Sequence, residues 1–593
     1  MKPAGQARRR LAAVLLGVLG LLVAAARAER LPGPAPLAGA EGEVIVRFKA
    51  EAATTRKHAL AAGAGEAMVR VALEGRAAAL GVRLDRVLGA GAAVSERMQV
   101  VRAAGVDAAT LARQLAADPE VEWAVPNGRK RRLTAPNDPL YAAAAHGVRP
   151  RGPDSGQWYL RAPDATLRSA IDVEAAWART RGSAGVVVAV LDTGVRFEHP
   201  DLGRAAAGGK LLPGYDFISD ATVANDGDGR DADPSDPGDW VSAAEANQAG
   251  GLFYHCGATD AAGRYIGEPS SWHGSSTASL VGALTDNGVG MAGTAPDVML
   301  LPVRVLGKCF GSNADILAAM RWAAGLPVPG VPDNPNPARV INMSLGGSGA
   351  CGIDYQTVVD ELVARGVTIV AAAGNSAGGA VGEPANCRGV LAVLALRHAG
   401  TKVGFSDLGP EIAIAAPGGN CVNVTAGSPC LYPILAATNS GTQGPAASGW
   451  SDSYDATVGT SFSAPLVAGV AALMLSAQPQ LAPVQLRTLM QSTARPFPQG
   501  GADNGSGDPT PVAPCVAPQV GVQQLQCYCT RELCGAGMLD AGAAVAAAAG
   551  ASAPDNGGGG SSNSGSGGGA MSHAWLALLA AAVGLLAAAQ RRR

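Results

Sequence analysis

The sequence predicts an α/β protein with a doubly wound, mostly parallel sheet and helices on both faces, preceded by a small α+β domain. In the central part of the chain, continuous apolar strands alternate with helical segments, which is typical of a buried parallel sheet. Functional residues of such folds cluster at the carboxyl ends of the strands. The predicted strands are 186–191, 298–305, 340–343, 367–373 and 390–396, and the predicted helices between them include 314–324 and 355–365.

Length and composition narrow the range of partners. At 593 residues the chain exceeds one ordinary domain, so we expect a catalytic body with appended processing segments. Charged residues make up only 16% of the chain and the net charge is −2. This balance gives no electrostatic reason to expect a nucleic acid partner.

Residues 1–28 have the three parts of a secretory signal peptide. Lys2 and the arginines at 8–10 precede an uncharged apolar run at 11–26, and Ala-Arg-Ala follows at 26–28. An uncleaved membrane anchor is the alternative, but the apolar run is short and the Ala-x-Ala site favours cleavage. We therefore expect export.

A small α+β unit is predicted at 29–132, with its core at 42–127. Segments 42–49 and 97–102 alternate polar and apolar residues as half-buried strands do. Helical stretches rich in Ala and Leu lie between these strands and again at 107–118.

The small unit ends in a basic run. An edge strand is predicted at 121–127, and Arg-Lys-Arg-Arg follows at 129–132. A small domain that ends in such an exposed, cleavable run is typical of a propeptide. An accessory domain retained in the mature protein is the alternative.

After the basic run we expect a mature N-terminal arm at 133–157 and the main α/β domain at 158–550. A short helix is predicted at 171–180. Another helix at 483–493 precedes a loop-rich, cysteine-rich part that closes the domain.

The chain ends in two segments of different composition. Residues 551–570 are rich in Gly, Ser and Asn and cannot bury enough apolar surface to fold, so they form a predicted flexible linker. The tail at 571–593 holds an apolar run at 574–589 and three terminal arginines, which match a short membrane helix with a cytoplasmic basic end. With Gly-Gly-Gly at 567–569, it resembles bacterial C-terminal sorting tails. A lipid-anchor signal and a buried helix of the catalytic body are the alternatives.

The ten cysteines are an even set in a chain predicted to be exported, so disulfides are expected. Spacing does not determine their connectivity. A zinc site at Cys527, Cys529 and Cys534 is the rival interpretation, but the spacing fits the usual ligand pattern poorly. The pairs we predict are Cys256 with Cys309, Cys351 with Cys387, Cys421 with Cys430, and two pairs among Cys515, Cys527, Cys529 and Cys534.

A hydroxyl set among small residues opens the most apolar helix of the domain. Gly-Thr-Ser at 459–461 leads into 466–474, which consists almost entirely of Ala, Val, Leu and Gly and is typical of a helix buried on all sides. Ser461 would lie near the first turn, where the helix N-terminus favours an oxyanion. An N-cap serine on a core helix is the alternative.

Two other segments supply the groups that a hydroxyl nucleophile needs. Asp192 follows a predicted strand, and His273 begins a predicted small-residue helix that continues to 284. Singly, Asp192 could be a turn-former and His273 a surface histidine. Together with Ser461 they predict a triad in which His273 takes the serine proton and Asp192 holds the ring. Asn375, after another strand, offers an amide for the oxyanion beside the Ser461 backbone N–H.

These segments resemble the subtilisin-like serine peptidases, the subtilases, over roughly 158–495. The resemblance implies that 42–127 is an inhibitory, chaperone-like propeptide, so that the chain would be a zymogen inhibited by its own propeptide. The motifs that carry it are Asp192-Thr193-Gly194, His273-Gly274, Ser344-Leu345-Gly346-Gly347, Ala373-Gly374-Asn375, and Gly459-Thr460-Ser461 with Pro465.

The resemblance also implies a substrate-binding cleft. The main chain of Ser344, Leu345 and Gly346 would pair with an extended substrate and would wall one side of the pocket for the residue before the cut. Gly374 would wall the other side. One departure stands at 275–279, where Ser-Ser-Thr-Ala-Ser keeps a hydroxyl but lacks the valine that usually packs this helix.

An acidic stretch at 226–236 lies in an apparent insertion between Asp192 and His273. Its carboxylates, Asp226, Asp228 and Asp231 first among them, could hold a structural calcium ion. A solvated acidic loop is the simpler interpretation.

We therefore expect a secreted, self-processing serine endopeptidase that hydrolyses proteins or peptides through an acyl-enzyme, acts as a monomer and needs no cofactor for catalysis. It would be found outside the cell or at the cell envelope, with the tail retained or removed. A catalytically weakened surface-binding protein is the alternative from another class. A sedolisin-like peptidase would carry Glu where His273 stands.

Overall fold

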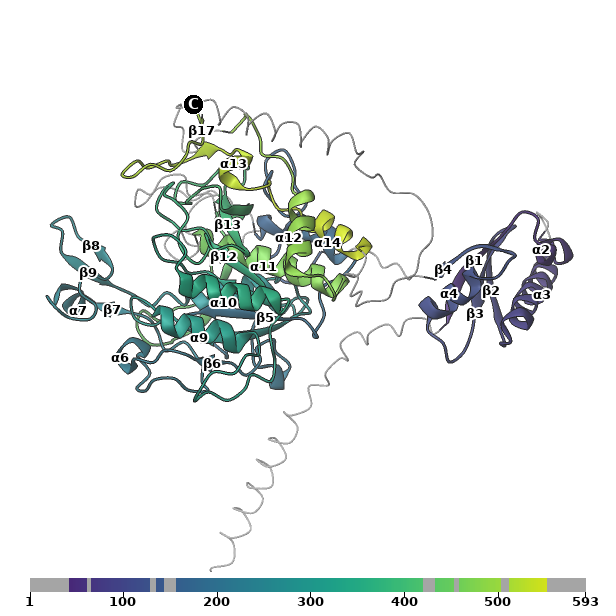
Figure 1. Ribbon diagram of the computed structural model, residues 1–593, viewed down its shortest axis with the longest axis horizontal. Helices are drawn as coiled ribbons and strands as arrows, with labels where there is room; N and C mark the ends of the chain where they lie inside the picture. Colours follow the sequence, from purple (N-terminus) through teal and green to yellow (C-terminus); the bar gives the residue numbers. More distant parts are fainter. Residues whose placement is uncertain are drawn as a thin grey trace, which may run out of the picture. The chain divides into compact units, whose positions relative to one another are not determined.

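The computed structural model divides the chain into two compact units, 1–132 and 133–593 (Figure 1). The predicted signal peptide, the basic run, the pair Cys421 and Cys430, and the C-terminal linker and tail lie outside the described residues. The residues that the structure describes are 42–60, 65–127, 135–142, 156–419, 432–452, 458–502 and 511–551.

An antiparallel sheet organises the first unit. Its strands are β1 (Glu43–Phe48), β2 (Gly89–Ser95), β3 (Met98–Arg102) and β4 (Val121–Pro126), and its helices are α2 (Ala53–Lys57), α3 (Glu66–Leu84) and α4 (Ala108–Ala116). The spatial order is β2-β3-β1-β4, so β4 lies at an edge as predicted. Alternation in β1 buries Val44, Val46 and Phe48, which confirms the half-buried strand. The strand β2 was not predicted, because its sequence GAGAAVS has little apolar side-chain bulk and is mostly exposed.

A seven-stranded sheet organises the second unit. Its strands are β5 (Val187–Asp192), β6 (Tyr215–Asp216), β10 (Met299–Arg304), β11 (Val340–Met343), β12 (Thr368–Ala372), β13 (Val390–Leu396) and β14 (Ile412–Pro417). Their spatial order is β14-β13-β12-β11-β5-β10-β6, and every pairing is parallel. The predicted α/β class and the five predicted strands are confirmed, while β6 and β14 were not predicted.

Helices cover both faces of this sheet, since alternate strand residues enter two separate cores. Val188 and Val190 of β5 face one core, and Ala189 and Leu191 face the other. The helices are α5 (Val173–Trp177), α8 (His273–Gly282), α9 (Asn313–Ala323), α10 (Ile353–Ala364), α11 (Thr460–Ala477), α12 (Pro483–Ser492) and α14 (Ala541–Gly550).

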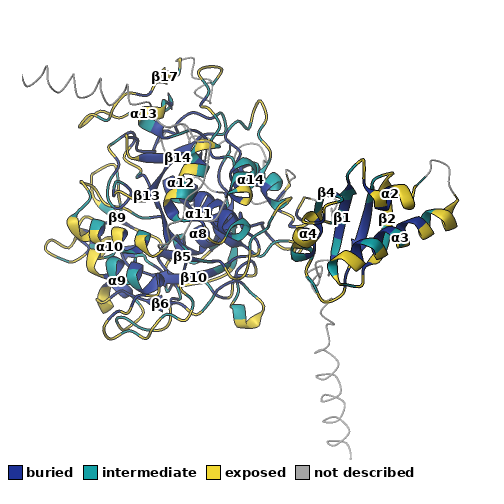
Figure 2. Ribbon diagram, turned by 45° about the vertical axis from the view of Figure 1, so that its right-hand side comes forward, coloured by how far each residue is buried: buried dark blue, intermediate teal, exposed yellow. Residues whose placement is uncertain are grey.

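The helix α11 is the centre of one core. It packs against α8, α14 and five strands of the sheet, and nearly all of its residues are buried (Figure 2). Among the described residues it is the one helix long and apolar enough to cross a membrane, yet 83% of it is buried inside the protein. It is therefore a core helix, as its Ala, Val, Leu and Gly composition predicts.

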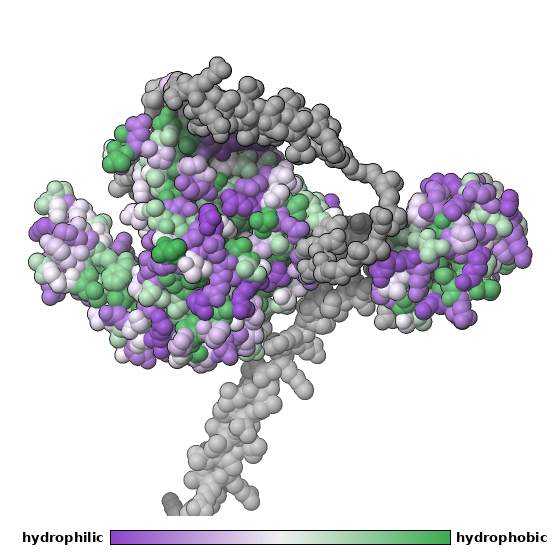
Figure 3. Space-filling view, in the orientation of Figure 1, coloured by the Kyte–Doolittle hydropathy of each residue, from purple (hydrophilic) through white to green (hydrophobic). Residues whose placement is uncertain are grey.

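Two loop-rich parts of the second unit lie outside the seven-stranded sheet. The first follows β6 and carries α6 (Ala221–Ala224), α7 (Ala243–Asn247) and a small antiparallel sheet of β7 (Val241–Ser242), β8 (Ala258–Thr259) and β9 (Tyr265–Glu268). The second holds the strand pair β15 (Ala436–Asn439) and β16 (Ser448–Ser451), then β17 (Ala513–Pro514), β18 (Cys527–Tyr528) and α13 (Arg531–Cys534). The surface of this unit in Figure 3 mixes hydrophilic and hydrophobic residues.

Disulfides fasten these parts and also join the segments that follow β11 and β12. The predicted pairs Cys256–Cys309 and Cys351–Cys387 are present, and the last four cysteines pair among themselves as Cys515–Cys527 and Cys529–Cys534. The sulfurs of Cys515, Cys529 and Cys534 lie within 4.8 Å of one another, but each is engaged in a disulfide. Disulfide bonding therefore replaces the zinc interpretation.

Candidate active site

Asp192 ends the central strand β5, and its carboxylate is held from three sides. Its side chain is 1% exposed. Oδ1 accepts hydrogen bonds from the Thr193 N–H at 2.8 Å and from His273 Nδ1 at 2.7 Å, and Oδ2 accepts from the Thr277 hydroxyl at 3.0 Å. A carboxylate only accepts, so Nδ1 of the imidazole carries the proton and Nε2 is left as the basic nitrogen.

His273 is the first residue of α8, and its side chain is 22% exposed. Its ring meets the Phe462 ring edge-on, with 5.6 Å between the centroids. Burial lowers the pKa of His273, but the charge and the hydrogen bond of Asp192, with smaller contributions from Asp239 and Asp236, hold that pKa above its ordinary value. The imidazolium that forms when His273 takes a proton is therefore stabilised.

Ser461 lies in the first turn of α11, next to Phe462. Its hydroxyl donates to the Ser344 carbonyl at 3.2 Å, and the Ser344 hydroxyl donates to the Ser461 carbonyl at 2.7 Å. No hydrogen bond joins Ser461 to His273 within the described part of the chain. Catalytic hydrogen bonds are often long or poorly aligned before substrate binds.

Asn375 follows β12 and is oriented by α11. Its Oδ1 accepts from the Thr460 N–H at 2.9 Å and from the Thr460 hydroxyl at 3.0 Å. This leaves Nδ2 as a donor near the helix N-terminus. Nδ2 lies 3.4 Å from where a Cβ of Gly459 would stand, and Gly459 has φ +151°, which other residues rarely adopt.

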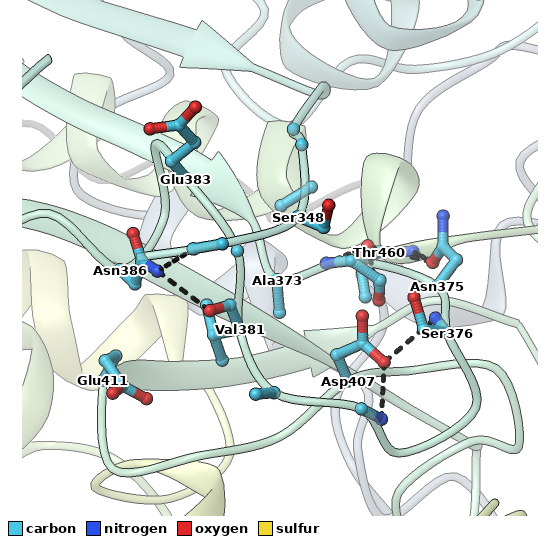
Figure 4. Close-up of a pocket in the computed structure, with 18 of the residues that line it drawn as sticks. Ser348, Ala373, Asn375, Ser376, Val381, Glu383, Asn386, Asp407, Glu411 and Thr460 are labelled. Carbon is cyan, nitrogen blue, oxygen red and sulfur yellow. Dashed lines mark hydrogen bonds between the residues drawn. The ribbon is translucent and has the colours of Figure 1, made fainter. Parts of the chain in front are cut away.

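A cavity of about 860 Å³ opens beside Ser461 (Figure 4). The segments 345–350 and 372–376 line it, so Leu345, Gly346 and Gly374 all border the same cavity. Ser344 does not line the cavity and instead bonds Ser461. Among the described residues, no hydrogen bond uses the main chain of Leu345 or Gly346. Their N–H and C=O groups can therefore pair with an extended peptide.

Three threonines that sequence reasoning did not single out support these groups. Thr277 donates to Asp192, Thr193 donates to Asp236 at 2.7 Å and accepts from the Gly274 N–H at 3.0 Å, and Thr460 holds Asn375. Thr193 lies in the motif Asp192-Thr193-Gly194 and Thr460 in the motif Gly459-Thr460-Ser461. Their positions in these motifs could have indicated that they support the site.

The departure at 275–279 has a structural explanation. Ser276 donates its hydroxyl to the Ala437 carbonyl at 2.7 Å, and the Ser279 hydroxyl accepts from the Ala437 N–H at 3.0 Å. Both serines are buried. Hydrogen bonds of Ser276 and Ser279 therefore fasten α8 to β15, while Thr277, at the position of the usual valine, donates its hydroxyl to Asp192.

The calcium candidates do not converge on one point. Asp226 forms an ion pair with the buried Arg304 and accepts from the Asp228 N–H at 3.3 Å, while the Asp231 carboxylate accepts from the Asp233 N–H at 2.8 Å. The guanidinium of Arg304, shared with Asp216, supplies the positive charge there. Among the described residues, metal-binding side chains converge at Cys515, Cys529 and Cys534, and not in this loop.

The parallel sheet, with an acid after β5, a histidine at the start of α8 and a serine at the start of α11, is the arrangement of a serine-peptidase class. A model of the subtilase family, peptidase S8, matches residues 183–512, more than half of the chain. The chain belongs to the subtilase family.

Similar proteins include an extracellular protease of Xanthomonas campestris, 42% identical over 403 residues, and an extracellular basic protease of Dichelobacter nodosus, 38% identical over 398 residues. The matches cover 68% and 66% of this chain but only 60% and 57% of those relatives. A solved structure of a protease from Pseudoalteromonas arctica superimposes with a TM-score of 0.53 at 37% identity and covers 70% of this chain and 100% of that one.

Proposed function

We propose that this chain is an exported serine endopeptidase in which Asp192, His273 and Ser461 form the catalytic triad. The observation that carries the proposal is the buried Asp192 bonded to His273 Nδ1, which leaves Nε2 beside the helix that holds Ser461. The names of the two relatives, both extracellular proteases, support the same activity and location.

In the proposed reaction, His273 Nε2 takes the Ser461 proton as Oγ attacks the peptide carbonyl. The tetrahedral oxyanion accepts hydrogen bonds from Asn375 Nδ2 and the Ser461 N–H. His273 then gives its proton to the leaving amine, and water releases the acyl group by the reverse sequence. The substrate main chain would pair with Leu345 and Gly346, with Gly374 opposite.

We further propose that the unit at 42–127 is a propeptide removed by the peptidase itself, and that the C-terminal tail holds the protein at a membrane before or instead of release. A short basic run and a Gly-rich linker in the sequence support these assignments. The competing function is surface binding by an inactive subtilase fold. The complete hydrogen-bond set around Asp192 favours catalysis.

Replacement of the triad tests the proposal. Ser461→Ala and His273→Ala should each lower casein hydrolysis by at least about a thousandfold, because nucleophile and base act as a unit. Circular dichroism and thermal unfolding check that each variant is folded. Residual activity within about tenfold of the parent would refute the triad.

A further inference from the structure

The cavity beside Ser461 is acidic. Three carboxylates, those of Glu383, Asp407 and Glu411, are among its lining residues, and none of the described residues that line it is a lysine, arginine or histidine. Because it adjoins the candidate nucleophile, its charge acts on the substrate side chain next to the scissile bond.

Asp407 is the buried member of the three and is rigidly held. It is 3% exposed. Oδ1 accepts from the Ser376 N–H at 2.9 Å and from the Gly379 N–H at 2.8 Å, and the Asp407 N–H donates to the Gly374 carbonyl at 3.0 Å. Both main-chain donors use Oδ1, and the Ser376 hydroxyl also interacts with the carboxylate, which still leaves acceptor lone pairs for a ligand. Figure 4 shows the second oxygen directed toward the Thr460 side of the cavity.

Gly374 allows this carboxylate to approach the catalytic segment. A Cβ at Gly374 would stand 2.3 Å from Asp407 Oδ2, and the residue has φ +114°. Gly374 immediately precedes Asn375, and its N–H donates to the Thr460 hydroxyl at 3.2 Å. The carboxylate therefore lies against the wall that also positions the oxyanion donor.

The other two carboxylates contribute less. Glu383 accepts from the Gly352 N–H at 3.1 Å and is directed away from Asp407 in Figure 4. Glu411 is exposed. Water screens an exposed charge strongly, so the buried Asp407 dominates the cavity.

Lys402 is the nearby cation, but it does not line the cavity. Its ammonium donates to the carbonyls of Val403, Gly404 and Ser406. Burial raises the pKa of Asp407, and its hydrogen bonds and Lys402 oppose that rise. A buried carboxylate that has no bonded cation is stabilised when a ligand supplies a cationic group.

We propose that Asp407 makes this cavity a subsite for a basic side chain, so that the enzyme cuts after arginine or lysine. The inference rests on the proposed peptidase function. An independent feature of the sequence points the same way: the predicted propeptide junction carries Arg-Lys-Arg-Arg at 129–132. A peptidase with this subsite could accept its own junction as a substrate.

Matched peptides that differ only in the residue before the cut test the proposal. We expect kcat/KM of the purified mature enzyme for Arg and Lys peptides to exceed that for the Leu peptide by at least about tenfold. Asp407→Asn keeps an acceptor for Ser376 and Gly379 but removes the charge. It should lower kcat/KM for Arg and Lys about ten- to a hundredfold and change the Leu value by less than about threefold.

Glu383→Gln is the matched control, because it removes a carboxylate from the same cavity and keeps an acceptor for Gly352. It should leave the Arg-to-Leu ratio within about threefold of the parent. The proposal is overturned if the parent prefers Leu, if Asp407→Asn lowers all peptides equally, or if Glu383→Gln abolishes the preference as Asp407→Asn does. Failure to hydrolyse any peptide would instead overturn the proposed function.

Discussion

At the scale of single residues, the site depends on one buried carboxylate. Asp192 orients the imidazole and raises the pKa of His273, while Asp239 and Asp236 make smaller contributions to that rise. The general base must be neutral to accept the serine proton, so activity should increase as the pH rises through this raised pKa.

This account predicts the effect of a remote charge on the pH profile. Asp239→Asn removes a negative charge that favours the protonated ring, so the pKa of His273 falls and the acid limb of kcat/KM moves to lower pH. The pH dependence of peptide hydrolysis measures this shift. Asp354→Asn, an exposed change in α10, is the control and should leave the limb in place. An unchanged limb in Asp239→Asn would contradict the electrostatic coupling of Asp239 to His273.

At the scale of elements, the helix α8 carries two hydroxyl side chains that bond different partners. Thr277 bonds the Asp192 carboxylate, and Ser276 bonds the β15 main chain. Because the two positions are adjacent, replacing each residue in turn distinguishes a role in the proposed triad from a role in the stability of the fold.

Thr277→Val should lower kcat about ten- to a hundredfold, because it leaves Asp192 Oδ2 buried without its donor. Thr277→Ser should restore most of the activity. Ser276→Ala should cost about 1 kcal/mol of unfolding free energy and change kcat by less than about threefold. Steady-state kinetics and denaturant unfolding give both quantities. Equal losses of kcat in the two variants would show that Thr277 acts only through the fold.

The elements also show how far the sequence could predict the structure. The strand at 186–191 was predictable because buried parallel strands are continuous apolar runs, and α11 because a buried helix is apolar on every face. The strand β6 has two residues, and α14 reads AGAAVAAAAG, so neither carries a distinctive periodicity. The place of Asp407 in the cavity could not be predicted, because Asp407 is far from Gly374 in the sequence. The two residues meet only once the sheet has formed.

At the scale of the whole molecule, a compact first unit precedes the unit that holds the candidate active site. Its antiparallel sheet has its own core, which includes Val46, Leu80 and Leu111. A separate core is what a removable propeptide needs, because its loss leaves the catalytic core intact.

Maturation of the full-length chain tests self-processing. Ser461→Ala should accumulate with residues 42–127 still attached, because the proposed cut near the basic run needs the nucleophile. Mass spectrometry of the N-terminus measures the outcome, and active parent added in trans should restore cleavage. Normal maturation of Ser461→Ala without added parent would assign the cut to another protease.

The central claim is that Ser461 is a nucleophile activated by His273. Incubation of the mature protein with a serine-directed phosphonate, followed by peptide mass spectrometry, tests it most directly. We predict one adduct per chain, on Ser461, formed in step with loss of activity and at least about a hundredfold more slowly in His273→Ala. An inactivated protein whose adduct lies on another residue, or an active protein that is never labelled, would contradict the claim.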